Sequence, residues 1–300
     1  MPFPNFLIIG AARSGTTSLH HYLGQHPQVF MCPVKEPNYF AFDGQLGELY
    51  GPGIEHLADK SVVERDAYLN LFRDVRGERA IGEVSPRYLI ARGCPERIAG
   101  EVPNAKLIAI LRHPVDRAYS SFIGRRKDGW EPCRDFREAF EAEPDRIAAK
   151  QTMGLHFSAG CYADRLQAYF AHFERDQIRV VLFDDLVGDP GSLLNELFGF
   201  LQVDPDFLPD FSKRHNQSGE IPNRGTRLFW QHSERMRRSV RRIIPEGWRD
   251  WAYERITQNL ERPELPASIR AEFTEYYRDD ISRLSEMIDR DLGCWLDGSR

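Results

Sequence analysis

Short, predominantly apolar runs constrain the fold of this chain more than any other feature of its sequence. The clearest runs lie at residues 6–9, 106–111 and 178–183, and weaker strand candidates lie at 29–31 and 80–82. Helical patterns follow at 18–23, after Pro114 and at 193–201. A strand that is apolar on both faces has to be buried on both, as in a parallel sheet covered by helices on either side. The sequence therefore predicts an α/β fold of the P-loop type with a central parallel sheet.

The strand pattern stops after residue 203. The remainder is predicted to be helical, with helices near 226–242, 246–260 and 267–290. We interpret the chain as a single domain over 1–300, with a parallel-sheet core over about 1–203 and a helical C-terminal part over about 204–300.

A glycine-containing segment, Gly10–Thr17 (GAARSGTT), joins the first apolar run to a helical pattern. In that setting the backbone N–H groups of the loop and of the helix N-terminus converge on an anion. The spacing matches a Walker A loop, except that Thr16 stands where that loop has its lysine. The lysine reaches the β- and γ-phosphates of a nucleoside triphosphate, so its absence argues against transfer of a γ-phosphate.

The strand candidate at 106–111 ends in Arg112-His113-Pro114 rather than in an aspartate that would hold Mg²⁺. Arg13 and Arg112 are then the cations available to an anionic ligand. Open α/β sheets bind ligands at the carboxyl ends of their strands, where both arginines are expected to lie. The pattern predicts a metal-independent site for a nucleotide with single phosphates at separate positions.

The overall charge argues against two classes of partner. The chain has 40 basic and 45 acidic residues, for a formal charge of −5. A protein that coats nucleic acid or an anionic membrane needs a basic excess, so neither partner is expected. No apolar stretch approaches the roughly 18 residues of a membrane span, and no basic leader opens the chain, which together predict a cytoplasmic protein.

Two segments together resemble the sulfotransferases that use 3′-phosphoadenosine 5′-phosphosulfate. AARSGTTSLHHYL (11–23) resembles the family's 5′-phosphosulfate loop, and LRHPVDRAYSSF (111–122) resembles its 3′-phosphate motif. Further likenesses to the heparan-sulfate-type and bacterial branch lie in KEPNYF (35–40), EVSPRY (83–88) and NRGTR (223–227). With the closing stretch around Trp295, the likeness spans nearly the whole chain.

The resemblance implies metal-independent transfer of a sulfuryl group from that donor to an acceptor hydroxyl, with adenosine 3′,5′-bisphosphate as product. Residues expected at the donor are Arg13, Ser14, Gly15, Thr16, Thr17, Ser18, Arg112, Ser120, Arg224, Gly225, Thr226 and Arg227. Residues expected at the acceptor are Lys35, Glu83 and Tyr88. Arg13 is also expected to act in catalysis, by stabilising charge on the leaving 5′-phosphate.

Two departures from the heparan-sulfate branch bear on the acceptor. That branch has a lysine after the glutamate of the 83–88 segment, and this chain has Val84 there. The branch also often has a disulfide near its basic loop, whereas this chain has no cysteine between 162 and 293. The resemblance therefore extends to the fold and the reaction rather than to a glycosaminoglycan acceptor.

The acceptor hydroxyl loses its proton as it attacks, which requires a general base. Glu36 is the first candidate, because the resemblance places the family's catalytic glutamate in this segment. Its aromatic neighbours are expected to raise its pKa toward neutrality. Glu83 is the second candidate. A histidine would be a third route, and the histidines considered are His20, His21 and His113.

Three other classes of function fit parts of the sequence. A P-loop kinase-like phosphotransferase would share the loop, but the lysine and the metal-binding aspartate are missing. A nucleotide-binding module without catalysis would leave Glu36 idle. A small-metabolite or phenol sulfotransferase would keep the reaction and change the acceptor. A glutamate base suits aliphatic and sugar hydroxyls, so a carbohydrate or glycolipid is the expected acceptor.

Overall fold

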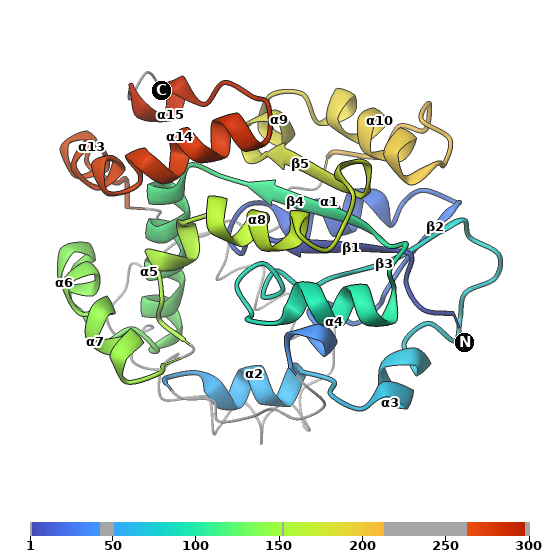
Figure 1. Ribbon diagram of the computed structural model, residues 1–300, viewed down its shortest axis with the longest axis horizontal. Helices are drawn as coiled ribbons and strands as arrows, with labels where there is room; N and C mark the ends of the chain where they lie inside the picture. The colour runs from blue at the N-terminus through green and yellow to red at the C-terminus, as the bar shows by residue number, and fades with distance from the viewer. Residues whose placement is uncertain (1, 43–50, 152, 213–262, 298–300) are drawn as a thin grey trace.

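A five-stranded parallel sheet forms the centre of the molecule (Figure 1). The computed structural model describes residues 2–42, 51–151, 153–212 and 263–297. The strand order is β2-β3-β1-β4-β5. The strands are β1 (Phe6–Gly10), β2 (Val29–Met31), β3 (Ala80–Val84), β4 (Lys106–Leu111) and β5 (Ile178–Leu182). All five lie where the sequence predicted strands, and the parallel α/β fold is confirmed.

The two faces of the sheet are buried in separate hydrophobic clusters. Along β1, Leu7 and Ile9 belong to one cluster, while Phe6 and Ile8 belong to the other. Because successive side chains of a strand point to opposite faces, an apolar residue is needed at every position. The apolar pattern of β1, and of β4 after Lys106, is therefore the direct consequence of helices on both faces.

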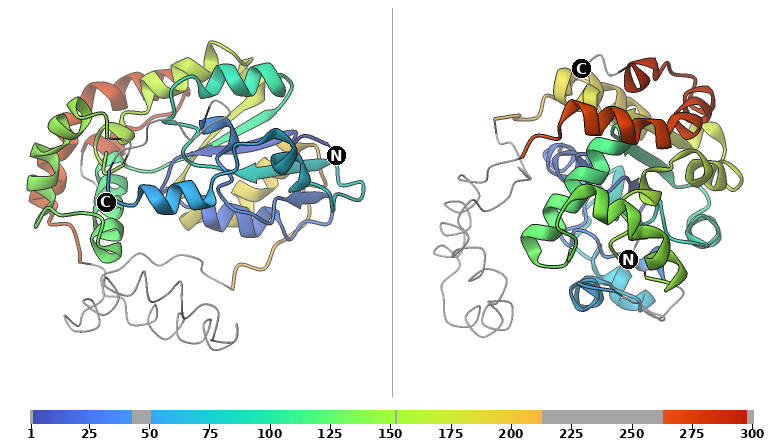
Figure 2. Two further views of the ribbon diagram at one scale, coloured as in Figure 1. Left: turned by 90° about the horizontal axis from the view of Figure 1, so that it is seen from below. Right: turned by 90° about the vertical axis from the view of Figure 1, so that its left-hand side faces the viewer.

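Helices from distant parts of the chain supply the other half of each cluster. The larger cluster receives side chains from α3 (Arg65–Asn70), α4 (Cys94–Glu101), α5 (Pro114–Asp128), α6 (Phe136–Glu141), α8 (Ala163–Phe170), α13 (Ala267–Tyr276), α14 (Arg278–Met287) and α15 (Gly293–Leu296). The smaller cluster receives them from α1 (Thr16–Leu23), α9 (Phe183–Gly188) and α10 (Pro190–Leu201). Two further helices are α2 (Ile54–Lys60) and α7 (Glu143–Ala148). Figure 2 shows the C-terminal helices α13 and α14 lying against this core, α13 beside α5.

The connections place a ligand-binding edge beside β1. The chain leaves β1 toward β2 and β3 on one side, then crosses over to β4 and β5 on the other. Loops at the carboxyl ends of β1 and β4 consequently diverge, and in open α/β sheets the crevice between two such loops holds the ligand. Both arginines predicted to hold an anion, Arg13 and Arg112, directly follow these two strand ends.

Some helix boundaries differ from the sequence prediction. The first helix begins at Thr16 rather than Ser18, because Gly15 takes a left-handed conformation (φ 93°) and starts it early. The helix predicted over 267–290 is two helices, α13 and α14, which meet at Tyr277. Tyr277 is fully buried, and its hydroxyl donates to the Phe157 carbonyl at 2.9 Å, which anchors the chain at the break.

The helices predicted near 226–242 and 246–260 lie outside the described residues. In the described part that follows β5, every regular element is a helix. The division into a sheet core and a helical C-terminal part of one domain stays a prediction.

Close packing between β1 and β3 gives a test of the fold. Gly82 pairs with Phe6, and a Cβ atom at Gly82 would lie 2.2 Å from Cζ of that ring. Phe6 is fully buried, so the ring has no room to move away. We expect Gly82→Ala to lower the free energy of unfolding, measured in urea, by about 1–3 kcal/mol.

The matched control for this test is Gly100→Ala on α4, where no atom lies within 4 Å of the new Cβ. This change should leave stability unchanged or raise it by up to about 1 kcal/mol through better helix propensity. Equal effects of the two substitutions would contradict the packing argument.

Candidate active site

The loop after β1 presents the N-terminus of α1 to the crevice. Gly15 caps α1 without any side-chain hydrogen bond to the helix. A Cβ atom at Gly15 would lie 2.8 Å from Cδ2 of Leu186 and 3.0 Å from Cδ2 of Phe183, so α9 packs directly on the loop backbone. The first N–H groups of a helix lack intrahelical partners, and the helix dipole adds partial positive charge there. This loop therefore has the geometry of an anion site.

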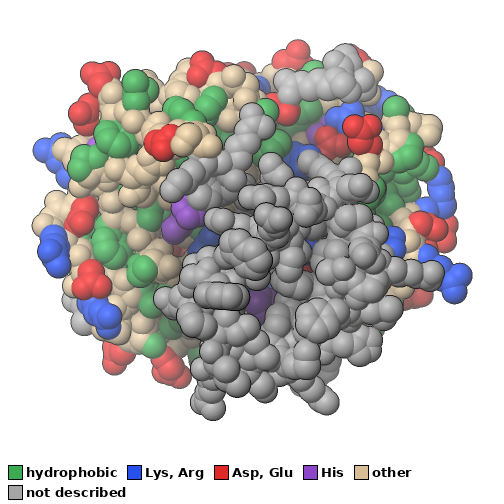
Figure 3. Space-filling view, turned by 180° about the vertical axis from the view of Figure 1, so that it is seen from behind, with side chains coloured by type: hydrophobic (Ala, Val, Ile, Leu, Met, Phe, Trp, Pro, Cys, Tyr) green, Lys and Arg blue, Asp and Glu red, His purple; other side chains and the backbone are tan. Residues whose placement is uncertain are grey.

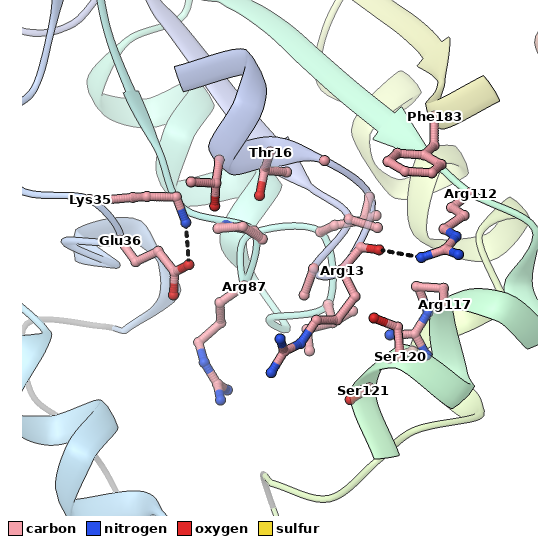
Figure 4. Close-up of a pocket in the computed structure, with 18 of the residues that line it drawn as sticks. Arg13, Thr16, Lys35, Glu36, Arg87, Arg112, Arg117, Ser120, Ser121 and Phe183 are labelled. Atoms are coloured by element: carbon pink, nitrogen blue, oxygen red, sulfur yellow. Dashed lines mark hydrogen bonds and ion pairs between the residues drawn. The ribbon is translucent and has the colours of Figure 1, made fainter. Parts of the chain in front are cut away.

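A cavity of about 890 Å³ opens in front of this loop (Figure 4). Its volume is within the range of sites that hold small-molecule ligands. The predicted residues that line it are Arg13, Gly15, Thr16, Thr17, Ser18, Lys35, Glu36, Arg112 and Ser120. Segments far apart in the sequence therefore meet at one site, as the resemblance implied.

Positive charge dominates the described lining of the cavity. Its cationic side chains are Arg13, Lys35, Lys60, Arg87, Arg112, Arg117 and Arg125, against the carboxylates Glu36 and Asp128. Burial, together with the nearby charges of Arg13 and Arg87, lowers the pKa of Arg125 to about 10. Three guanidinium groups thus share one electrostatic environment. The outer surface differs, since Figure 3 shows basic and acidic side chains interspersed around its rim.

One face of α5 forms a wall of the cavity. The lining residues of this helix are Arg117, the adjacent pair Ser120 and Ser121, Arg125 and Asp128, with three or four positions between one turn and the next. That spacing puts them on one side of a helix. Ala118 and Phe122 lie on another side and are buried in the core. The polar stripe of α5 is therefore a binding surface rather than a solvated one.

Arg112 and Ser120, the two residues of the expected 3′-phosphate motif, both line the cavity. The Arg112 guanidinium stacks over the Phe183 ring at 4.7 Å, and its Nη1 lies 3.5 Å from the Arg13 carbonyl oxygen. Ser120 is only 2% exposed, yet it lines the cavity. The ring and the carbonyl hold the arginine at the carboxyl end of β4, beside the loop.

Arg13 depends on a glycine that the sequence analysis did not single out. A Cβ atom at Gly124 would lie 2.5 Å from Arg13 Nη2, so the guanidinium rests on the bare backbone of α5. Arg13 itself has a left-handed backbone (φ 69°), which turns its side chain out of the loop and into the cavity. Figure 4 shows this guanidinium facing the same open space as Arg87.

Glu36 is held in a strained loop across the cavity. It has φ 64°, and Asn38 has φ 55°. Left-handed backbone is unfavourable for residues other than glycine and persists where the surroundings impose it. The end of β3 does so here: the Glu36 N–H donates to the Val84 carbonyl at 2.9 Å, and the Asn38 N–H donates to Ser85 Oγ at 3.0 Å.

The prediction that the pKa of Glu36 is raised is wrong. Burial does raise this pKa, but the Lys35 charge and its hydrogen bond, with Lys60 and Arg13 further off, outweigh burial and lower it below the ordinary value. Lys35 Nζ lies 2.7 Å from Glu36 Oε1. The carboxylate is therefore ionised at neutral pH.

Three predicted residues do not line the cavity. Ser14 is fully buried. Glu83 is also fully buried and accepts hydrogen bonds from Tyr68 (3.3 Å), Ser85 (2.8 Å) and Tyr88 (2.5 Å). Burial raises the pKa of Glu83 to about 7. Because Ser85 also receives the Asn38 N–H, the Glu83 and Tyr88 cluster supports the Glu36 loop from behind instead of meeting a substrate.

The remaining predicted residues lie outside the described part of the chain or away from the cavity. The segment Arg224–Arg227 lies outside the described residues. Neither His20 nor His113 lines the cavity, and the His113 ring lies 2.9 Å from the Trp295 carbonyl oxygen. The residues that sequence analysis missed are Lys60, Arg87, Arg117, Ser121, Gly124, Arg125 and Trp130. Two signals were present in the sequence: the polar residues of α5 recur at helical spacing, and Arg87 lies in the EVSPRY segment.

The sheet order, the glycine loop and the cation-lined cavity together define a P-loop-type α/β protein with a site for an anionic ligand. A family model described as "Sulfotransferase family" matches residues 4–207, and the chain belongs to that family. The expected membership, including the likeness to the heparan-sulfate-type and bacterial branch, is confirmed.

Two relatives and one solved structure show how far the likeness extends. The chain is 26% identical, over 98% of its length, to the mouse bifunctional heparan sulfate N-deacetylase/N-sulfotransferase 4, and 25% identical to the human enzyme 3 of that name. It spans 31% of the length of each. The crystal structure of a sulfotransferase from Alicyclobacillus acidocaldarius has 31% sequence identity and a TM-score of 0.78, covering 98% of this chain and 99% of that one.

Two further findings concern the described part of the chain. It contains no group of three or more His, Cys, Asp or Glu side chains placed to hold a metal ion. Among the helices described, none has the length and apolar character needed to cross a membrane.

The ion pair at Glu36 predicts a shift in pH dependence. The pKa of Glu36 is lowered, so its charge is lost only when the pH falls through that lowered value. Lys35→Gln removes the positive charge that lowers this pKa most, so the pKa of Glu36 should rise. If Glu36 acts as a base, the acidic limb of the kcat profile should move to higher pH in this variant.

Lys60→Gln is the control, because Lys60 acts on Glu36 by charge alone and more weakly than Lys35. We expect a smaller shift in the same direction. A Lys35→Gln profile that overlays the wild-type profile would show that this ion pair does not set the ionisation of Glu36.

Proposed function

We propose that this chain transfers a sulfuryl group from 3′-phosphoadenosine 5′-phosphosulfate to a hydroxyl of a carbohydrate acceptor, with Glu36 as the general base. One observation carries the proposal: a single cavity places an ionised carboxylate opposite an anion loop flanked by Arg13 and Arg112. A carbohydrate acceptor is supported by the relatives whose names state that they act on heparan sulfate.

The donor's two phosphate positions fit two separate groups of residues. The loop amides, the N-terminus of α1 and Arg13 suit the 5′-phosphosulfate, because charge grows on that phosphate as it leaves. Arg112 and Ser120 suit the 3′-phosphate, since they lie at the end of the neighbouring strand β4 and its following helix. A bidentate guanidinium is well matched to phosphate oxygens.

Glu36 would act on the other reactant. Its carboxylate, ionised and held by Lys35, accepts the proton of the acceptor hydroxyl as the oxygen attacks sulfur. The side chain is 42% exposed, and the exposed part faces the cavity, so an acceptor can reach it. Sulfuryl transfer resembles phosphoryl transfer in being driven by positioning and by stabilisation of developing charge, which the cationic lining supplies.

The same geometry counts against a kinase. Thr16 at the start of α1 provides a hydroxyl where a Walker A loop provides its lysine, and β4 is followed by an arginine rather than by an acidic residue. These side chains are suited to binding separate phosphates and less so to a triphosphate.

The assignment of Arg112 predicts selectivity for the 3′-phosphate. Arg112→Ala should weaken binding of adenosine 3′,5′-bisphosphate by roughly 10-fold or more, the contribution of a charged hydrogen bond. Binding of adenosine 5′-monophosphate, which lacks that phosphate, should change little. Isothermal titration of both nucleotides measures the difference, and equal weakening of the two would remove Arg112 from this role.

The assignment of Glu36 predicts a defect in chemistry alone. Glu36→Gln keeps the shape of the side chain but cannot accept the proton, so kcat for sulfate transfer should fall by about 10²–10⁴-fold. The affinity for adenosine 3′,5′-bisphosphate should stay within about twofold, because the phosphate contacts belong to other residues.

Glu83→Gln is the matched control, since this glutamate lies behind the loop. It should lower stability, seen in thermal unfolding, more than it lowers kcat of the folded enzyme. A near-normal Glu36→Gln enzyme beside an inactive but folded Glu83→Gln enzyme would transfer the base role to Glu83.

A further inference from the structure

A chain of hydrogen bonds runs from a buried ion pair to the wall of the cavity. Arg146 donates to both oxygens of Glu131, at 2.7 and 2.6 Å. Glu131 Oε2 lies 2.7 Å from His156 Nε2, and His156 Nδ1 lies 3.0 Å from Ser121 Oγ. The side chains of Glu131 and His156 are both fully buried, whereas Ser121 lines the cavity.

Charge balance sets the ionisation of this group. Burial raises the pKa of Glu131, but hydrogen bonds from His156, Arg146 and the Cys133 N–H bring it well below the ordinary value, so the group is a carboxylate. The charge of Arg146 already neutralises it. A protonated His156 would add a second buried cation, and burial accordingly lowers the pKa of His156. The imidazole is therefore neutral.

Neutrality fixes the direction of every hydrogen bond. A carboxylate only accepts, so His156 Nε2 carries the ring proton and donates it to Glu131. His156 Nδ1 then has a lone pair, and the Ser121 hydroxyl donates to it. The single proton of Ser121 is thereby committed to the histidine, and its oxygen presents lone pairs to the cavity.

Ser121 lies on α5 between Ser120 and the glycine that supports Arg13. On α5 it follows Ser120, and one turn later Gly124 supports the Arg13 guanidinium. Figure 4 shows Ser121 facing the same space as Arg13. A group bound there contacts an oxygen that accepts a hydrogen bond and cannot donate one.

We propose that Ser121 is a specificity-determining residue that accepts a hydrogen bond from a hydroxyl group of a bound substrate. The inference rests on the proposed function, under which the ribose of the donor and a carbohydrate acceptor both carry such hydroxyls. Sites built around a fixed polar group reject analogues that leave the group unpaired. His156 and Glu131 are positioning residues, since they act only by orienting the Ser121 hydroxyl.

The donor side is tested by binding. Adenosine 3′,5′-bisphosphate is compared with its 2′-deoxy and 2′-fluoro-2′-deoxy forms by isothermal titration, on wild type and on Ser121→Ala. If the ribose meets Ser121, wild type prefers the hydroxyl form by about 3–10-fold over the deoxy form. Wild type should bind the fluoro form most weakly, because fluorine cannot donate a hydrogen bond and its partial negative charge is repelled by the serine lone pairs. Ser121→Ala removes these preferences.

The acceptor side is tested by transfer. Methyl β-D-glucopyranoside and its monodeoxy analogues serve as acceptors, and kcat/KM is measured with the same two proteins. If the acceptor meets Ser121, one deoxy position lowers kcat/KM in wild type by about 3–10-fold and has no effect in Ser121→Ala. In both arms Ser121→Thr, which keeps the hydroxyl, should retain the wild-type preference.

The proposal is overturned if Ser121→Ala shows the wild-type preferences in both arms. Absence of transfer from the sulfuryl donor to any acceptor would instead count against the proposed function, and the binding arm would still test Ser121. His156→Phe gives an independent readout: it removes the ring nitrogen that accepts the Ser121 proton, so that the hydroxyl can donate into the cavity. That variant should then bind the fluoro form no more weakly than the deoxy form.

Discussion

Gathering so many cations around one cavity is the constraint on which the rest of this structure depends. Like charges in a partly desolvated space repel one another, and the pKa of Arg125 is lowered first by burial and then by this repulsion from Arg13 and Arg87. Neutral groups contact three of these arginines: Phe183 lies under Arg112, the His156 carbonyl accepts from Arg117, and the ring of Trp130 lies near Arg125. Carbonyls and rings orient a guanidinium without neutralising its charge.

The ionisation of Glu36, the carboxylate proposed as the base, depends on the same cationic surroundings. A glutamate in an aromatic-rich loop would ordinarily have a raised pKa, yet the cation beside it reverses the direction for Glu36. Its loop is strained at two residues and is held by the end of β3, where Ser85 connects Asn38 to the buried Glu83. The two glutamates that sequence analysis treated as rivals therefore have different surroundings, one facing the cavity and one supporting the loop that carries the other.

Sequence patterns predicted the sheet well because burial on both faces leaves a local signature in each strand. Even the short strand β2 and the weak candidate β3 lie where expected. The loop of Gly10–Thr17 and the Arg112 motif were also recognisable, since their function is set by spacing along a few residues. Helix ends were less predictable, as at Tyr277, a buried residue between α13 and α14 whose hydroxyl bonds to the distant Phe157 carbonyl.

By itself, the sequence determined the parallel sheet, the anion loop without its lysine, and the arginine that replaces an acidic residue after β4. Each of these is a property of consecutive residues. Only the tertiary structure brought Lys60, Arg87 and Arg125 to the same cavity, withdrew Glu83 from it, and lowered the pKa of Glu36. Ionisation and hydrogen-bond direction depend on distances between segments far apart in the chain, and those distances exist only after folding.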